Sequence, residues 1–343
     1  MPCSASTGSI SKLGCTGAAL SALLLLGGAA RSQPGASPAR LAIYYGYPSL
    51  VNGAGGDLAR AVAVFSEYDL VVLGDGLEFD GAGRGAGPEE HAFATRLIER
   101  LRGSPRHSEV YGYVDLGGTQ QLRLEEIEHR IDLWARMGAA GVLLDEAGFD
   151  FGVSRERQNR AISAAHARGL SACLNAFEPG DVFGSTPTPL NAAGGGNPTG
   201  AAPVVSARDA VLLESFAVRN GVAQSADALW TRARTALEGR ARFGARVFAV
   251  STSADPGEDM TLAQYGWWTA AALGLDAYGW GMPSFSAVTS QLPWVRRPEA
   301  EAVLSHARYL DEPTLHDGRW RRSTTVGSIV VDGTLRAGAF EPR

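Results

Sequence analysis

The sequence predicts an α/β protein, a (β/α)8 TIM barrel with a short C-terminal β-hairpin extension. From Leu41 onward, short apolar runs alternate with longer amphipathic segments, and the pattern recurs about every 30 to 40 residues, as strand and helix units do. Eight such runs fit into roughly 250 residues, the usual size of this barrel. The chain has 343 residues, of which 45% are hydrophobic, so it can bury a sizeable core. A doubly wound sheet is the structural alternative.

The eight apolar runs are the expected strands, because each is short and is bounded by glycine or polar residues. They cover residues 41–45, 69–74, 109–116, 141–146, 169–175, 210–215, 246–252 and 275–281. In this architecture the functional groups stand where strands end, so the residues at those ends are the candidates for chemistry.

Amphipathic segments between these runs have helical spacing, and several of them end in Gly, as helix C-termini prefer. They cover residues 57–68, 91–103, 123–138, 155–169, 225–244 and 259–274. Residues 185–204 are rich in Gly, Pro, Ser and Thr, which predicts a long irregular loop on the active-site face.

The two ends of the chain differ from the predicted barrel at residues 41–318. Residues 1–33 contain a short apolar run followed by small residues, which is typical of a secretory signal peptide, and residues 34–40 would be a flexible lead-in. Export to the periplasm or the exterior is therefore expected, with an uncleaved membrane anchor as the alternative. Residues 319–343 contain two β-like runs about Asp332 and Gly333, which predicts a hairpin.

Charge and cysteine content exclude several classes of function. The formal charge is −5 with scattered Lys and Arg, so nucleic acid is not an expected partner. Beyond the predicted signal peptide the only cysteine is Cys173, in an apolar stretch, where a buried structural thiol is expected. We predict no cofactor, no metal and no stable membrane insertion after signal cleavage, and the sequence leaves the oligomeric state open.

The predicted strand ends are acidic and aromatic. Histidine, cysteine and a glycine-rich phosphate loop do not occur there, which disfavours nucleophilic triads, zinc hydrolysis and phosphoryl transfer. Facing carboxylates framed by aromatic rings suit glycoside hydrolysis, in which one acid protonates the leaving oxygen and the other attacks or activates water. For a single acid the alternative is helix capping, because Asp is a favoured N-cap residue. The strand ends carry Tyr45, Asp75, Tyr113, Asp115, Asp145, Glu146, Asn175, Glu214 and Trp280.

Several segments, taken in order, resemble glycoside hydrolase family 114, the endo-α-1,4-polygalactosaminidase-like TIM-barrel proteins. They include YYGYP, YDLVVLGDGLE, VYGYVDLG, GVLLDEAGFDFGVSRERQN and LLESF, and the resemblance runs from about Leu41 to Trp280. The resemblance implies that Asp145 and Glu214 form the catalytic pair. It also implies internal cleavage of a galactosamine-containing polysaccharide.

The remaining strand-end residues are expected to bind the sugar: Tyr45, Asp75, Tyr113, Asp115, Glu146, Asn175 and Trp280. Adjacent strand residues point to opposite faces, so Asp145 and Glu146 are not expected to reach one substrate atom together. Asp150, Arg155 and Asn159 are expected to organise the following loop and helix. Two other functions stay open, a carbohydrate-binding barrel without turnover and a cation-dependent hydrolase that uses the same acids.

Overall fold

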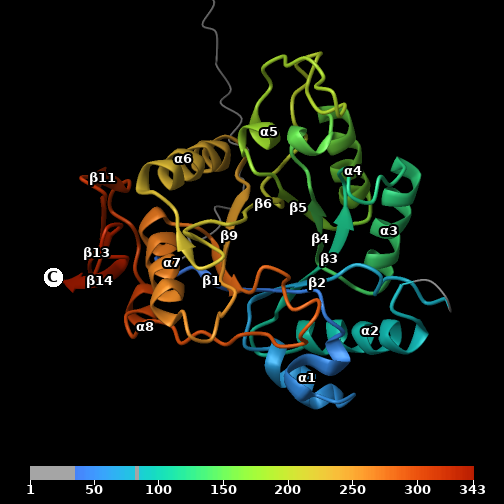
Figure 1. The fold of residues 1–343 in the computed structure, drawn as a ribbon, viewed down its shortest axis with the longest axis horizontal. Helices are drawn as coiled ribbons and strands as arrows, with labels where there is room; N and C mark the ends of the chain where they lie inside the picture. Colours follow the sequence, from blue (N-terminus) through green and yellow to red (C-terminus); the bar gives the residue numbers. More distant parts are fainter. Residues whose placement is uncertain (1–34, 82–84) are drawn as a thin grey trace, which may run out of the picture. The chain divides into compact units, whose positions relative to one another are not determined.

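The structure is a computed structural model, and it describes residues 35–81 and 85–343. Eight parallel strands form a closed barrel in the order β1-β10-β9-β6-β5-β4-β3-β2 (Figure 1). This confirms the predicted (β/α)8 TIM barrel, while the predicted signal peptide at residues 1–33 lies outside the described residues. The strands are β1 Ala39–Tyr44, β2 Leu70–Leu73, β3 Glu109–Asp115, β4 Gly141–Asp145, β5 Ser171–Asn175, β6 Ala210–Leu213, β9 Arg246–Thr252 and β10 Ala277–Gly281.

Helices surround this barrel (Figure 1). Their starts follow local capping chemistry: the side chains of Asp57, Ser154 and Ser225 accept backbone N–H bonds at the starts of three helices. Within the described ranges every helix is too short or too polar to span a lipid bilayer. The longer helices are α1 Leu58–Phe65, α2 Pro88–Arg102, α3 Leu124–Arg136, α4 Arg155–Ala167, α6 Ala226–Phe243 and α7 Met260–Leu273; short ones are η1 Pro48–Gly53, η2 Phe149–Phe151, α5 Gly180–Phe183 and α8 Glu301–Leu304.

Alternation along the strands produces two separate hydrophobic cores. Side chains such as Ile43, Leu143 and Phe248 fill the barrel interior, while their strand neighbours pack outward against the helices. The outer layer is tight at Gly112, where an added Cβ would lie 1.9 Å from the ring of Trp134. Cys173 belongs to the inner core and is 2% exposed, which confirms a buried thiol, and burial raises its pKa to about 12.

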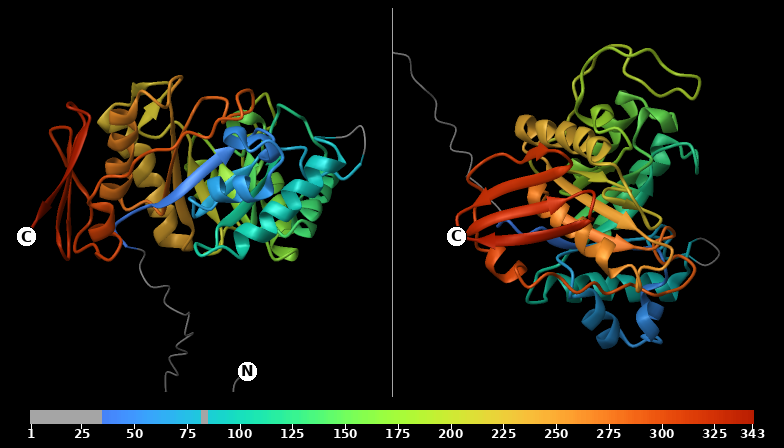
Figure 2. Two further views of the ribbon diagram at one scale, coloured as in Figure 1. Left: turned by 90° about the horizontal axis from the view of Figure 1, so that it is seen from below. Right: turned by 60° about the vertical axis from the view of Figure 1, so that its left-hand side comes forward.

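A four-stranded antiparallel sheet follows the barrel, in the order β11-β12-β13-β14. The strands are β11 Thr314–His316, β12 Arg319–Thr324, β13 Gly327–Asp332 and β14 Ala337–Pro342. This sheet covers the outer side of α7 (Figure 2), where an added Cβ on Gly338 would meet Trp268. The predicted hairpin about Asp332 and Gly333 is therefore present as β13 and β14, and two further strands extend it.

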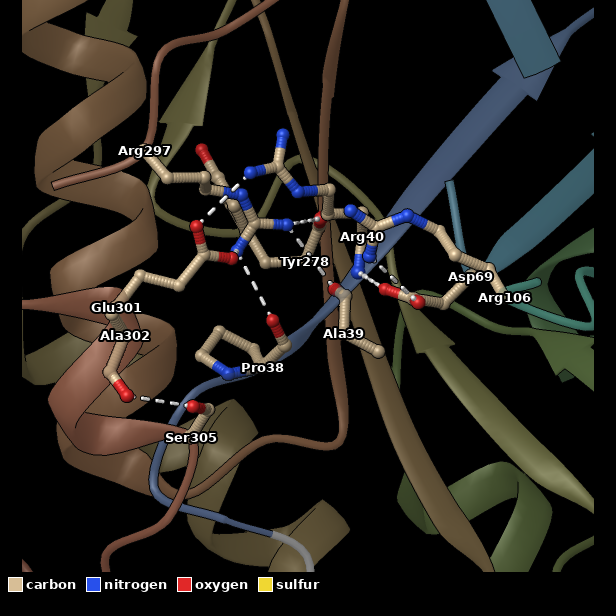
Figure 3. Close-up of polar contacts among 10 residues, drawn as sticks. All are labelled: Pro38, Ala39, Arg40, Asp69, Arg106, Tyr278, Arg297, Glu301, Ala302 and Ser305. Atoms are coloured by element: carbon tan, nitrogen blue, oxygen red, sulfur yellow. Dashed lines mark hydrogen bonds and ion pairs between the residues drawn. The ribbon is translucent and has the colours of Figure 1, made fainter. Parts of the chain in front are cut away.

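The seam at which the barrel closes, between β1 and β10, is held by the hydrogen bonds and ion pairs of arginine side chains (Figure 3). The Arg297 guanidinium donates to the carbonyls of Pro38, Ala39 and Tyr278, at 3.1, 3.4 and 3.4 Å. Glu301 accepts from Arg40 at 3.0 Å. These contacts tie the chain after β10 to the start of β1, so the seam is fixed by side chains as well as by strand pairing.

The long loop predicted at residues 185–204 is present, with no helix or strand in that described stretch. Arg155 lies at its base and donates to the carbonyls of Asp181, Val182 and Gly184. Asn159 holds its far end through Ala202 and Val204. Arg155 and Asn159 therefore hold the segment after β5, whereas they were expected to organise the loop after β4 and the start of α4.

Candidate active site

Five polar side chains from β1 and from the four neighbouring strands β3, β4, β5 and β6 reach the carboxyl end of the barrel. Each of them comes two residues after a side chain that belongs to the inner core, so alternation directs it toward the barrel axis. Three stand on the last residues of β3, β4 and β5 or close to them, and two directly follow β1 and β6. They are Tyr45, Tyr113, Asp145, Asn175 and Glu214.

The amide of Asn175 joins the two acids. Its Nδ2 donates to Oδ1 of Asp145 at 2.7 Å and to Oε2 of Glu214 at 2.7 Å. The two carboxylate oxygens therefore lie no more than 5.4 Å apart, which is twice 2.7 Å. The acids that the sequence places 69 residues apart thus form one pair, and Asn175 fixes their spacing.

The two carboxyls differ in how their charge is stabilised. Burial raises the pKa of Asp145, while hydrogen bonds from Asn175 and Tyr113 oppose that rise. Burial also raises the pKa of Glu214; Asn175 opposes this rise, and the negative charge of Asp145 adds to it. The positive charges of Arg232 and Arg219 also oppose the rise at Glu214.

Two tyrosines lie beside Asp145. The rings of Tyr45 and Tyr113 meet edge to face, with centroids 5.3 Å apart, and Tyr45 also packs against Phe285 at 5.4 Å. Burial and the nearby acids raise the pKa of both hydroxyls well above the ordinary value, so both stay neutral. Neutral hydroxyls can donate hydrogen bonds to a bound ligand or to Asp145.

An open cavity of about 250 Å³ contains the acid pair. Four of its residues were not predicted from the sequence: Phe151 and Phe177, which are 42% and 49% exposed, Ser215 and Arg219. The signal for the two rings was an aromatic residue shortly after a predicted strand end, in GFDFG and NAF. The cavity is lined by Asp145, Glu146, Phe151, Asn175, Phe177, Glu214, Ser215 and Arg219.

Arg232 of α6 fixes the position of Phe177. Its guanidinium carbon lies 4.5 Å from the centroid of that ring, and its Nε donates to the Phe177 carbonyl at 3.1 Å. Nη2 of the same guanidinium donates to the Glu214 carbonyl at 3.1 Å. One cation therefore holds both an exposed ring and the backbone of an acid of the pair.

Glu146 also lines the cavity, although it follows Asp145 directly. Strand β4 ends at Asp145, and Glu146 adopts a positive φ of 52°, so the alternation expected for adjacent strand residues stops there. The carboxylate of Glu146 accepts from the backbone N–H of Thr119 at 2.9 Å and from its hydroxyl. Gly117 lies so close that an added Cβ would be 2.4 Å from the Glu146 Cβ.

Three residues predicted to bind the sugar lie elsewhere. Asp115 is fully buried and accepts the backbone N–H groups of Gly117 and Gln120, so it holds its loop instead of lining the cavity. The prediction that Trp280 binds the sugar is wrong. Trp280 is 6% exposed and packs outward, because Ala277, three residues earlier, faces the barrel interior. Asp75 is exposed and lines a second cavity of about 550 Å³ that it shares with Tyr45.

Comparisons with known proteins assign the chain to no family. No family model matches the chain, and no curated relative matches it. Among solved structures it is similar to the glycoside hydrolase domain of PelA from Pseudomonas aeruginosa, with a TM-score of 0.43 and 16% identity over 75% of this chain and 100% of that one.

The chain is also similar to two further solved structures. One is a family 27 β-L-arabinopyranosidase from Geobacillus stearothermophilus, with a TM-score of 0.46 and 12% identity over 86% of this chain and 84% of that one. The other is an HpcH/HpaI aldolase from Desulfitobacterium hafniense, with a TM-score of 0.38 and 11% identity over 72% and 87%. Likeness at this level does not assign an activity, and the resemblance to family 114 stays a prediction.

Proposed function

We propose that this protein is a retaining glycosidase that uses Asp145 as nucleophile and Glu214 as acid and base. The observation that carries the proposal is the shared amide of Asn175, which keeps two carboxylate oxygens within 5.4 Å. Retaining enzymes space their carboxyl groups about 5 to 5.5 Å apart, whereas inverting enzymes leave roughly 6.5 to 9.5 Å for a water molecule.

The reaction has two steps. In the first, an Asp145 oxygen attacks the anomeric carbon while Glu214 gives its proton to the leaving oxygen, so the glycosidic bond breaks and a glycosyl ester forms. In the second, Glu214 takes a proton from water, the water oxygen attacks the anomeric carbon, and the ester breaks to regenerate Asp145. The first step requires a protonated Glu214; burial and the negative charge of Asp145 raise the pKa of this carboxyl.

The proposed substrate is an amino-sugar polysaccharide, as the family 114 resemblance implies, and the enzyme would cut it internally after export. Glu146 supports this substrate class, because its carboxylate lines the cavity beside Asp145 and can face a sugar ammonium group. Phe151 and Phe177 supply partly exposed rings for the apolar face of a sugar.

Activated aryl glycosides separate the two roles. Asp145→Asn should lose turnover of 4-nitrophenyl galactosaminide, N-acetylgalactosaminide and every other aryl glycoside. Glu214→Gln should keep fast release of the good leaving group and accumulate a glycosyl ester on Asp145, detectable by intact mass, with turnover restored by azide. Proton NMR of the first product should show the substrate's anomeric configuration. Full activity of Asp145→Asn, or an inverted product, would refute the assignment.

Two other functions predict different results with the same reagents. A carbohydrate-binding barrel would bind amino-sugar oligosaccharides in calorimetry and release no reducing ends after long incubation. A cation-dependent hydrolase would lose activity in a chelator. Among the described residues no group of three or more His, Cys, Asp and Glu side chains could hold a metal ion.

A further inference from the structure

A short hairpin after β6 places one arginine at the cavity. Strands β7 Val218–Arg219 and β8 Val222–Ala223 pair in antiparallel register, with a tight turn at Asn220 and Gly221. The hairpin is anchored on β9, because the Asn220 N–H donates to the Thr252 hydroxyl at 3.2 Å and the Gly221 N–H donates to the Thr252 carbonyl at 2.9 Å. The backbone of Arg219 is therefore held in place, while its side chain is exposed.

The guanidinium of Arg219 is a cation without an acid of its own. Across residues 35–81 and 85–343, no carboxylate lies within ion-pair distance of it and no hydrogen bond engages it. This differs from Arg232, which is engaged by Phe177 and the Glu214 carbonyl. Arg219 lines the cavity of the acid pair, and its charge acts on Glu214. Its donors are thus available to a ligand in that cavity.

The position of Arg219 in the cavity indicates which part of the substrate it contacts. It follows Glu214 by five residues and shares the cavity wall with Phe177. In the proposed mechanism Glu214 protonates the leaving oxygen, so the groups around Glu214 face the sugar that leaves. Five donors in a planar fork make arginine the side chain best suited to a carboxylate.

We propose that Arg219 binds the carboxylate of an acidic sugar on the leaving-group side of the bond that is cleaved. The inference rests on the proposed function for the direction of the substrate, and on the geometry of the cavity for the ligand chemistry. With Glu146 beside Asp145 and Arg219 near Glu214, the cavity fits a polymer in which an amino sugar precedes an acidic sugar. Specificity for the acidic sugar then resides in Arg219.

Calorimetry with an acidic oligosaccharide and its neutral methyl ester tests this inference. Trigalacturonate and its methyl ester are titrated into the full-length protein carrying Asp145→Asn, which prevents turnover. We expect the acid form to bind about 10-fold tighter than the ester, the size of a charged hydrogen bond reduced by exposure. Adding Arg219→Gln should bring the two affinities together. Raising the salt concentration should weaken binding of the acid form only while Arg219 is present.

Arg234→Gln is the matched control, because Arg234 is an exposed arginine of α6 that pairs only loosely with Glu238, at 3.8 Å, and does not line the cavity. It makes the same change in charge and should leave the preference unaltered. Equal binding of acid and ester, failure of trigalacturonate to bind, or a preference that survives Arg219→Gln would overturn the inference. If no glycoside is hydrolysed but binding depends on Arg219, the proposed activity fails and the carboxylate site stands.

Discussion

Asn175→Ala is the change that most directly tests how the acid pair is held. It removes the nitrogen that donates at 2.7 Å to both Asp145 and Glu214. A hydrogen bond to a charged group contributes about 1.5 to 3 kcal/mol. Losing one such contribution from the transition state lowers kcat/KM by roughly 10- to 100-fold, since each 1.36 kcal/mol is a factor of ten. Loss of the fixed spacing adds to this effect.

The pH profile gives this prediction its specific signature. Asn175 lowers the pKa of both carboxyls, so its removal raises both of them. Because the nucleophile must be ionised and the acid protonated, the whole bell-shaped profile of kcat/KM should move to higher pH. The profile is measured with an activated aryl glycoside between pH 4 and 9.

Asn52→Ala is the control for general damage to the fold. Its side chain joins the N–H and carbonyl of Leu292, at 2.7 and 3.1 Å, far along the chain from the acids. It should lower the melting temperature and leave the pH profile in place. A profile that does not move in Asn175→Ala, with kcat/KM within about threefold of the unmodified protein, would refute the reasoning.

Three further changes have definite expected results. Burial raises the pKa of Glu78 from 4.5 to about 7, so the stability present below pH 4.5 falls by about 3 kcal/mol as the pH rises through 7. Glu78→Gln should abolish this fall in urea unfolding at pH 4.5 and 8; an unchanged fall would contradict it. Gly112→Ala should lower the free energy of unfolding by about 2 kcal/mol or more, because the added methyl group would clash with Trp134. Unaltered stability would show that the outer core can accommodate the methyl group. Phe177→Ala should raise KM about fivefold for the polymer, from the loss of roughly 1 kcal/mol of ring contact, and an unchanged KM would remove Phe177 from the binding site.

Periodicity in the sequence was sufficient to find the barrel and its strand ends, whereas the resemblance to family 114 singled out Asp145 and Glu214 as a pair. The strand ends follow from short apolar runs, and the side of each strand follows from alternation, so Asp145, Asn175 and Glu214 could be placed on one face before any coordinates. Alternation also determines the side of Trp280, but it was not applied to that residue. Counting back three residues to the inward Ala277 would have turned Trp280 outward.

Other features depend on irregular backbone, which periodicity does not describe. Glu146 enters the cavity because its φ of 52° breaks the strand pattern. Phe151 lies in a single turn of helix, and Arg219 lies in a two-residue strand after β6. The direction of each side chain is set by hydrogen bonds to distant segments, such as the anchoring of the hairpin on Thr252. Such contacts have no local signature in the sequence.

The cavity carries side chains of opposite charge on its two sides, because these side chains come from different strands. Glu146 comes from β4, directly after the proposed nucleophile, and Arg219 comes from the segment after the proposed acid on β6. Between these strands lies β5, whose Asn175 binds both acids. A ligand that spans the pair therefore meets a negative group on the β4 side and a positive group on the β6 side. A polymer with alternating positive and negative sugars would bind in one orientation, because the reverse orientation opposes like charges at both walls.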